Sequence, residues 1–247
     1  MESITSTKNK WVKYVQQLQK PRHRKQHRAF VLEGWHLVEE AVKEGANIQT
    51  VFTTSDSLPF QVNCPCYHVT EHVLKAMATT PTPQGIIAIA SQLEQPKIEQ
   101  LTGRLLVLDN VQDPGNVGTM IRTADAAGYD GVIINQGSVD IYNPKVIRST
   151  QGSLYHLPIV YTEIEQWMEQ FKAQGGCIYG TELNEAAVDY RTLQPSLPFA
   201  VVMGNEGQGV SQSILKQTTK NVYLPMKGRA ESLNVAVATG ILLFRWQ

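Results

Sequence analysis

The chain has 247 residues, 42% of them hydrophobic, which is enough to bury a substantial core in one large domain or two small ones. Its 22 basic and 22 acidic residues leave no net charge at pH 7, so no global electrostatic field points to a nucleic-acid partner. Three cysteines, no recognisable signal peptide and no apolar run of membrane-spanning length favour a cytoplasmic protein with free thiols and no membrane contact.

Positive charge is concentrated near the N-terminus. Residues 1–28 contain a single acidic residue, Glu2, against a set of basic ones: Lys8, Lys10, Lys13, Lys20, Arg22, Arg24, Lys25 and Arg28. We expect this segment to be a basic arm. Such a run is typical of a solvated, solubilising surface and also of a phosphate-binding one, and charge alone does not separate the two.

Residues 29–91 alternate between apolar stretches of strand length and amphipathic stretches of helix length, which predicts a small α/β domain. The expected strands are 30–33, 48–53, 66–69 and 85–90, and the expected helices are 35–44 and 71–78. Gly45 closes the first helix and Thr70 caps the second. Residues 92–103 follow as a linker, because the polar stretch 92–100 carries Pro96 and has no sustained periodicity.

Residues 104–247 show a stronger alternation of the same kind. The expected strands are 105–108, 131–134, 157–160, 177–179, 200–203 and 222–224. The expected helices are 114–127, 164–174, 211–217 and a last one that Ser232 opens and that runs almost to Gln247. Apolar strands that alternate with helices predict a parallel sheet covered on both faces, so the fold class is α/β, with two domains.

Three loops of the second domain begin at the ends of predicted strands: 109–122, 203–211 and 224–238. In the first, Asp113 caps a helix that Pro114 begins, and Gly118 and Arg122 lie four residues apart on one helix face. Parallel sheets bind ligands outside the carboxyl ends of their strands. The three loops are therefore expected to form one site.

Several familiar chemistries do not fit these loops. Residues 204–209 read G-x-x-G-x-G after a late strand, with no acidic residue about twenty positions on, so a dinucleotide site is not favoured. The glycines allow a close approach to a ligand, or simply a tight turn. Residues 68–72 match the text of a zinc-peptidase motif but straddle a strand end and a helix cap, and we expect no metal.

The three loops resemble the motifs of the SpoU/TrmH family of RNA 2′-O-methyltransferases, in the SPOUT superfamily. The matching residues are Asn116-x-Gly118-x-x-x-Arg122, then Gly204-Asn205-Glu206-Gly207-x-Gly209, then Leu224-Pro225-Met226-x-Gly228-x-x-x-Ser232-Leu233-Asn234-Val235. This resemblance covers residues 104–247. Residues 30–90 are similar to the L30e-like substrate-binding domain of the family, on the strength of Phe30–Gly34 and the order of the layers.

The resemblance implies a trefoil knot in the C-terminal domain, which is an exception to unknotted topology. It also implies S-adenosylmethionine as cofactor, bent among the knot loops, and a homodimer in which two protomers complete the active site. Carried over by motif, the cofactor-binding residues are Gly204, Leu224, Met226 and Leu233. The catalytic group is Asn116, Arg122, Glu206, Ser232 and Asn234.

The implied role of Arg122 raises a chemical problem. The family is usually described with this arginine as the base, yet a guanidinium keeps its proton at any ordinary pH. Arg122 therefore needs the help of the phosphate of the target, or it stabilises developing negative charge while another group accepts the proton. We expect Arg122 to reach the site of the partner protomer, where Glu206 and Asn234 orient it and the ribose.

The expected substrate is structured RNA, with 23S rRNA as the first choice. Ribosomal RNA is preferred over tRNA because the shorter tRNA enzymes of the family often lack the L30e-like domain. Three alternatives stay open: a tRNA 2′-O-methyltransferase, base methylation, as in another knotted branch, and a non-catalytic RNA-binding factor in ribosome assembly. The presence of Asn116, Arg122 and Glu206 favours an enzyme.

Overall fold

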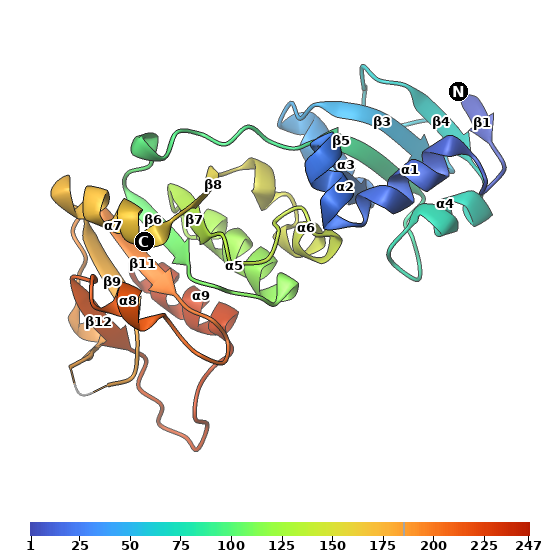
Figure 1. The fold of residues 1–247 in the computed structure, drawn as a ribbon. Coiled ribbons are helices and arrows are strands. Elements are labelled where there is room, and N and C mark those ends of the chain that lie inside the picture. The colour runs from blue at the N-terminus through green and yellow to red at the C-terminus, as the bar shows by residue number, and fades with distance from the viewer. Residues whose placement is uncertain (185) are drawn as a thin grey trace. The chain divides into compact units, whose positions relative to one another are not determined.

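The computed structural model describes residues 1–184 and 186–247 and forms two compact units. The first unit contains residues 1–94 and 140–155, and the second contains residues 95–139 and 156–247. Each unit has its own sheet (Figure 1). Each also has its own buried hydrophobic cluster. The expected division into two α/β domains is thus present, but the chain passes between the units more often than the sequence suggested.

The sheet of the first unit has the strand order β1-β4-β3-β5-β2. Its strands are β1 (Glu2–Ile4), β2 (Ala29–Glu33), β3 (Ile48–Thr53), β4 (Cys66–Val69) and β5 (Ile86–Ser91). β4 runs parallel to both β1 and β3, whereas β5 is antiparallel to β3 and β2. The helices of this unit are α1 (Lys10–Leu18), α2 (Pro21–His27), α3 (Trp35–Lys43), α4 (Glu71–Met77) and α6 (Pro144–Thr150).

Residues 1–28 belong to the folded first unit, which corrects the expectation of a separate arm. β1 pairs with β4 from Glu2 to Ile4, and α1 buries Val12, Val15 and Leu18 in the core of the unit. These apolar positions recur every three residues, a helical spacing that places them on one face. Lys10 and Lys13 lie on the exposed face of the same helix, and these charges obscured the apolar spacing in the sequence.

Residues 140–155, expected in the second domain, belong to the first unit through contacts of Arg24, which is only 1% exposed. Its Nε and Nη2 donate to one carboxylate oxygen of Asp140, at 2.9 and 2.7 Å. Its Nη1 donates to the carbonyl oxygens of Leu18 and Gln19, at 3.1 and 2.8 Å. The buried guanidinium is thus paired and hydrogen-bonded, as a buried charge must be.

The second unit contains a parallel sheet, which was expected, with the strand order β10-β12-β9-β11-β6-β7-β8 in its described part. The strands are β6 (Arg104–Leu108), β7 (Gly131–Asn135), β8 (Ile159–Thr162), β9 (Cys177–Thr181), β10 (Val188–Asp189), β11 (Phe199–Met203) and β12 (Lys220–Tyr223). β6 and β11 are neighbours in register, with Leu108 opposite Met203, so the loops that follow them leave the sheet side by side. The trefoil threading implied by the resemblance stays a prediction.

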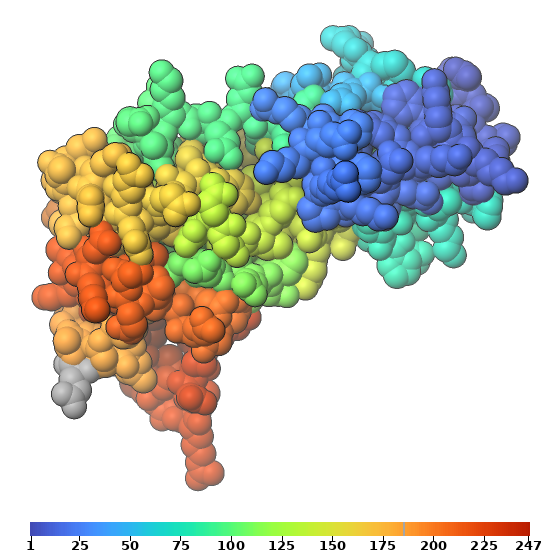
Figure 2. Space-filling view, in the orientation of Figure 1, coloured from blue at the N-terminus to red at the C-terminus, as the bar shows by residue number. Residues whose placement is uncertain are grey.

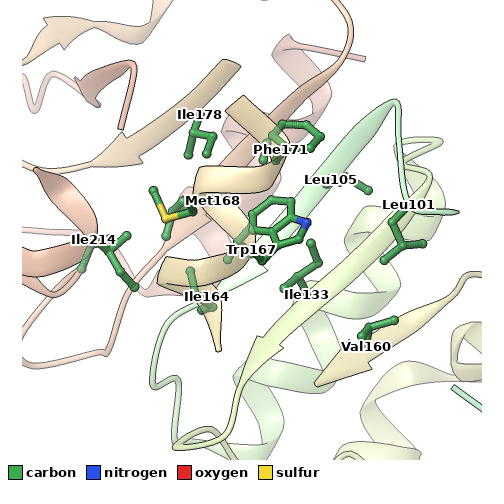
Figure 3. Close-up of a cluster of buried hydrophobic side chains, with 14 of the residues drawn as sticks. Leu101, Leu105, Ile133, Val160, Ile164, Trp167, Met168, Phe171, Ile178 and Ile214 are labelled. Atoms are coloured by element: carbon green, nitrogen blue, oxygen red, sulfur yellow. The ribbon is translucent and has the colours of Figure 1, made fainter. Parts of the chain in front are cut away.

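Helices cover both faces of this sheet. On one face, α7 (Ile164–Ala173) and α8 (Gln212–Leu215) pack over alternate strand residues, including Leu105 and Val107 (Figure 3). Trp167 stacks on Phe171 within this cluster, with ring centroids 4.9 Å apart. The intervening strand residues, such as Leu106, point to the opposite face. There α5 (Pro114–Ala126) and α9 (Val235–Arg245) pack against each other and against β7 and β11.

The last helix begins at Val235, three residues later than expected. Asn234 is its N-cap, because the side-chain oxygen of Asn234 accepts hydrogen bonds from the backbone N–H groups of Ala236 and Val237, at 2.9 and 3.3 Å. Ser232, expected to open this helix, lies instead in an exposed loop between β12 and α9. This loop projects from the second unit (Figure 2).

Arg24→Ala should destabilise the first unit by about 1–3 kcal/mol, because it removes a buried guanidinium and leaves the partly exposed carboxylate of Asp140 and the carbonyl oxygens of Leu18 and Gln19 without this donor. Urea unfolding, combined with hydrogen exchange of first-unit amides, measures this loss. Lys43→Ala is the control, since it removes exposed pairs with Glu39 and Glu40 and should leave the unfolding free energy nearly unchanged. Equal stability of the two variants would contradict the role of Arg24.

Candidate active site

A buried carboxylate joins two of the three loops at the ends of their strands. Asp109 is the first residue after β6 and is 1% exposed. One of its oxygens accepts the N–H of Ser211 at 2.7 Å, and the other accepts the side-chain amides of Asn110 and Asn135, at 2.9 and 3.3 Å. Asp109 therefore fixes the loop after β6 to the loop after β11 and to the end of β7.

The loop after β11 folds back on itself. The backbones of Asn205 and Gly209 exchange two hydrogen bonds of 2.9 Å, and the Asn205 side-chain oxygen accepts the N–H groups of Gly207 and Gln208. A Cβ on Gly204 would lie 2.1 Å from the backbone of Gly209. No side chain fits there, so the loop itself requires the glycine at position 204 whatever ligand it binds.

Glu206 projects from this loop onto the start of α5. Its carboxylate accepts the N–H groups of Asp113 and Gln112, at 3.0 and 3.3 Å, and the side-chain amide of Asn116 at 3.1 Å. Partial burial acts to raise the pKa of Glu206, but the hydrogen bonds from Asn116 and from the backbone outweigh it and lower the pKa. Glu206 is thus an ionised group that holds other groups in place.

The third loop joins the same network through Asn234. Its side-chain nitrogen donates to the side-chain oxygen of Asn116 at 3.0 Å, while the nitrogen of Asn116 donates to Glu206. We call Asn234, Asn116 and Glu206 the amide relay. Because the carboxylate can only accept and the Asn234 oxygen caps α9, every amide in the relay has one possible orientation. The relay therefore links all three loops.

A cavity of about 420 Å³ opens between these loops. All four residues expected to bind the cofactor line it, together with two of the expected catalytic residues: Gly204, Leu224, Met226, Leu233, Glu206 and Ser232. Met226 and Leu233 are each 37% exposed. The cavity thus combines apolar side chains, open to solvent, with one fixed carboxylate, and its size suits a small organic ligand.

Arg122 lies apart from this cavity. It is an exposed residue of α5, and among the described residues none forms a hydrogen bond or ion pair with its guanidinium. The structure therefore brings together Asn116, Glu206 and Asn234 by direct hydrogen bonds and places Ser232 on the cavity wall. It leaves Arg122 free to act on a group from outside its own chain.

Two features of the site were not predicted from the sequence. Residues 181–183, at the end of β9 and just after it, line the cavity, with Glu182 accepting a hydrogen bond from Gln212 at 3.2 Å. They belong to no recognised motif, but their place at the end of an apolar strand was a usable signal. Asp109 was also missed, although an acidic residue directly after a buried strand indicates a loop anchor.

The described residues offer no metal site of protein ligands: no group of three or more His, Cys, Asp or Glu side chains is placed to hold an ion. Residues 68–72, which match the zinc-peptidase motif, are shared between a strand and a helix, as expected: His68 lies in β4 and Thr70 caps α4. Nor does any helix in the described part of the chain have the length and apolar character to cross a bilayer.

Comparisons with known families identify both parts of the chain. The sequence model of the SpoU rRNA methylase family matches residues 103–244, and that of the MRM3-like substrate binding domain matches residues 9–88. The chain belongs to the SpoU rRNA methylase family. The first match covers the three loops and the amide relay, and the second includes most of the segment that had been expected as an arm.

The similarity to individual relatives extends over nearly the whole length of the chain. The chain is 41% identical to the 23S rRNA (guanosine(2553)-2′-O)-methyltransferase RlmP of Bacillus subtilis, over 99% of this chain and 98% of the relative. An AdoMet-bound rRNA methyltransferase of Sinorhizobium meliloti superposes with a TM-score of 0.89 at 33% identity, covering 99% and 96% of the two chains. The SpoU methyltransferase AviRb of Streptomyces viridochromogenes, in complex with AdoMet, gives a TM-score of 0.86 at 25% identity, with 96% of each chain covered.

The pKa of Glu206 should rise toward its ordinary value in Asn116→Ala, because the strongest of the hydrogen bonds that lower it is lost. A ¹³C NMR titration of the side-chain carboxyls measures this, with Thr119→Ala, on the exposed face of the same helix, as control. Because the folded-state pKa is the lower one, Glu206 stabilises the fold above the unfolded pKa, and this contribution disappears as pH falls through the folded value. An unchanged pKa in Asn116→Ala would refute the relay.

Proposed function

We propose that this chain is an S-adenosylmethionine-dependent RNA (ribose-2′-O)-methyltransferase that acts on 23S rRNA in the cytoplasm. The observation that carries the proposal is the cavity beside the amide relay, in a chain that belongs to the SpoU rRNA methylase family. The rRNA substrate is favoured by the relative from Bacillus subtilis, which matches both domains. The target nucleotide named for that relative is the first position to examine.

The cavity has the lining that S-adenosylmethionine requires. Leu224, Met226 and Leu233 offer apolar surface for the adenine ring, and the carboxylates of Glu182 and Glu206 suit the hydroxyl and cationic groups of the molecule. When bound, S-adenosylmethionine supplies a methyl group that is already activated for transfer. The protein then has to hold a ribose hydroxyl in line with this methyl group and manage one proton.

The residues of the chain divide these tasks. Glu206, with its lowered pKa and three donors, is a poor proton acceptor at neutral pH, so it positions Asn116 and the start of α5. Arg122 keeps its proton and stabilises the negative charge that develops on the 2′-oxygen, while the phosphate of the target accepts the proton. Asn234 holds the third loop against Asn116, and Ser232, on the cavity wall, offers its hydroxyl to the ribose.

A homodimer would bring Arg122 to its place of action. Val237, Ile241 and Phe244 of α9 are 52%, 36% and 50% exposed and lie on one helix face. An exposed apolar stripe of this kind favours burial against another protein surface. Since α9 packs on α5, which carries Arg122, pairing of two copies through this stripe would bring the guanidinium close to the partner subunit.

The first unit would hold the RNA. Residues 29–91, expected as the RNA-binding domain, share this unit with the basic residues of 1–28. Exposed Lys10 lies over the ring of Trp11, 5.9 Å from its centroid, and Tyr14 and Tyr67 lie near this tryptophan. Positive charge beside half-buried aromatic rings that still reach the surface favours contacts with phosphates and unpaired bases.

The proposed function predicts that the purified protein converts one nucleoside of a 23S rRNA fragment into its 2′-O-methyl form when S-adenosylmethionine is supplied. Arg122→Ala should lower the rate roughly 100-fold or more, because stabilisation of the developing charge is lost. Its affinity for S-adenosylmethionine should not change, since Arg122 does not line the cavity. Nucleoside mass spectrometry of the product measures both the yield and the methylated position.

Thr119→Ala is the control for this experiment, because Thr119 is also exposed on α5 and bonds only within that helix. Methylation of a base in place of a ribose would assign the chain to another chemistry. RNA binding without any methylation would favour the assembly factor. A wild-type rate in Arg122→Ala would remove Arg122 from the catalytic group.

A further inference from the structure

A second cavity, also of about 420 Å³, lies within the first unit and was not predicted from the sequence. It is bounded by the start of α3, the loop between α4 and β5, and α6, and we call it the α3–α6 pocket. Its lining includes Gly34, His36, Thr82, Gln84, Arg148 and Gln151. We propose that the α3–α6 pocket binds one unpaired nucleotide of the RNA substrate, with Arg148 on the phosphate and Gln84 and Gln151 on the base edge. This inference rests on the proposed function.

Glu33, at the end of β2, builds one wall of the pocket. Its carboxylate accepts the N–H and hydroxyl groups of Thr79 at 2.9 and 2.8 Å, the N–H of Thr80 at 3.1 Å, and the hydroxyl of Thr80. Burial acts to raise the pKa of Glu33, but these hydrogen bonds outweigh it and lower the pKa. Glu33 is therefore occupied in holding the loop after α4 and is a positioning residue.

Arg148 supplies the positive charge of the pocket. One guanidinium nitrogen donates to the hydroxyl of Thr79 at 2.7 Å, and among the described residues no carboxylate pairs with this arginine. The remaining guanidinium N–H groups have the planar arrangement that matches phosphate oxygens. Since Thr79 is itself held by Glu33, the guanidinium has a fixed position beside the cavity.

Side chains that can read a base surround this charge. The Nε2 of His36 lies 3.1 Å from the carbonyl oxygen of Gln151, which can only accept, so this nitrogen carries the proton and Nδ1 is an acceptor in the neutral ring. The amide groups of Gln84 and Gln151 each offer a donor and an acceptor, the combination that recognises base edges. Leu37 and Pro81 add apolar surface for the face of a base.

The pocket is preformed. Gly34 has φ +106°, and a Cβ at this position would lie 2.6 Å from the side-chain oxygen of Gln84, so glycine keeps the space beneath that amide open. Pro81 and Pro83 restrict the loop that carries Gln84. A rigid pocket loses little conformational entropy when a ligand enters. An unpaired nucleotide is the ligand that needs a base-reading edge, an apolar wall and a phosphate contact together.

Two variants of the full chain test the proposal: Arg148→Ala and Gln84→Ala. Their dissociation constants for a 23S rRNA fragment should rise about 10-fold or more, because a charged and a neutral hydrogen-bonding group are lost. The same rise should appear in KM for RNA, while the effect on kcat and on S-adenosylmethionine affinity should be small by comparison. Lys75→Ala is the matched control, since it removes one charge from the exposed face of α4, outside the pocket.

A set of RNA fragments with single abasic positions identifies the bound nucleotide. One abasic position should lower the RNA affinity of the wild-type protein. The same abasic position should not lower the RNA affinity of Gln84→Ala any further, because the contact to that base is already lost. RNA affinities of both variants equal to that of Lys75→Ala would overturn the proposal, and so would the lack of any abasic position with this pattern. Binding is measured without S-adenosylmethionine, so a protein that binds RNA through the pocket but does not methylate it contradicts only the proposed function.

Discussion

The amide relay is the constraint on which the site depends. Three loops that are distant in sequence leave the same edge of the sheet because β6, β11 and β12 all run parallel, but strand pairing fixes only where the loops begin. Asn116, Glu206 and Asn234 fix where they end, since each bond in the relay has one allowed direction. Asp109 supports the relay because it accepts the N–H of Ser211 and so anchors the loop that carries Glu206. The buried hydrophobic cluster of the second unit stabilises the sheet and its helices, and a few polar contacts set the shape of the cavity.

The two units use a carboxylate in the same way. Glu206 and Glu33 each follow a buried strand, receive several hydrogen bonds from an adjacent segment and have a lowered pKa. Neither is then available as a proton acceptor near neutral pH, and each arranges a loop around a cavity of about 420 Å³. Positive charge for contacts with the substrate would then come from Arg122 in one unit and, in the other, from Arg148, whose guanidinium is held by the hydroxyl of Thr79. This division suits an enzyme that must orient a large RNA at separate points.

Local signals in the sequence predicted most elements, and long-range contacts caused the errors. Asp113 and Thr70 cap α5 and α4 as expected, because a cap is a contact between near neighbours. The start of α9 was placed wrongly, since Ser232 and Asn234 can both cap a helix and the bond to Asn116 selects Asn234. The attachment of residues 140–155 depends on the buried pair of Arg24 and Asp140. The site residues came from a family resemblance, whereas the α3–α6 pocket was not predicted, because its walls are distant in the chain.

Calorimetric titration of the purified protein with S-adenosylmethionine is the most direct test of the central claim, that the relay shapes a cavity for this molecule. We expect the wild-type protein to bind one molecule per chain, and Asn116→Ala to bind about 10-fold more weakly, because the three loops lose their common link. A folded wild-type protein that releases no heat of binding would contradict the account. Equal affinities of the wild-type protein and Asn116→Ala would show that the relay does not shape the cavity.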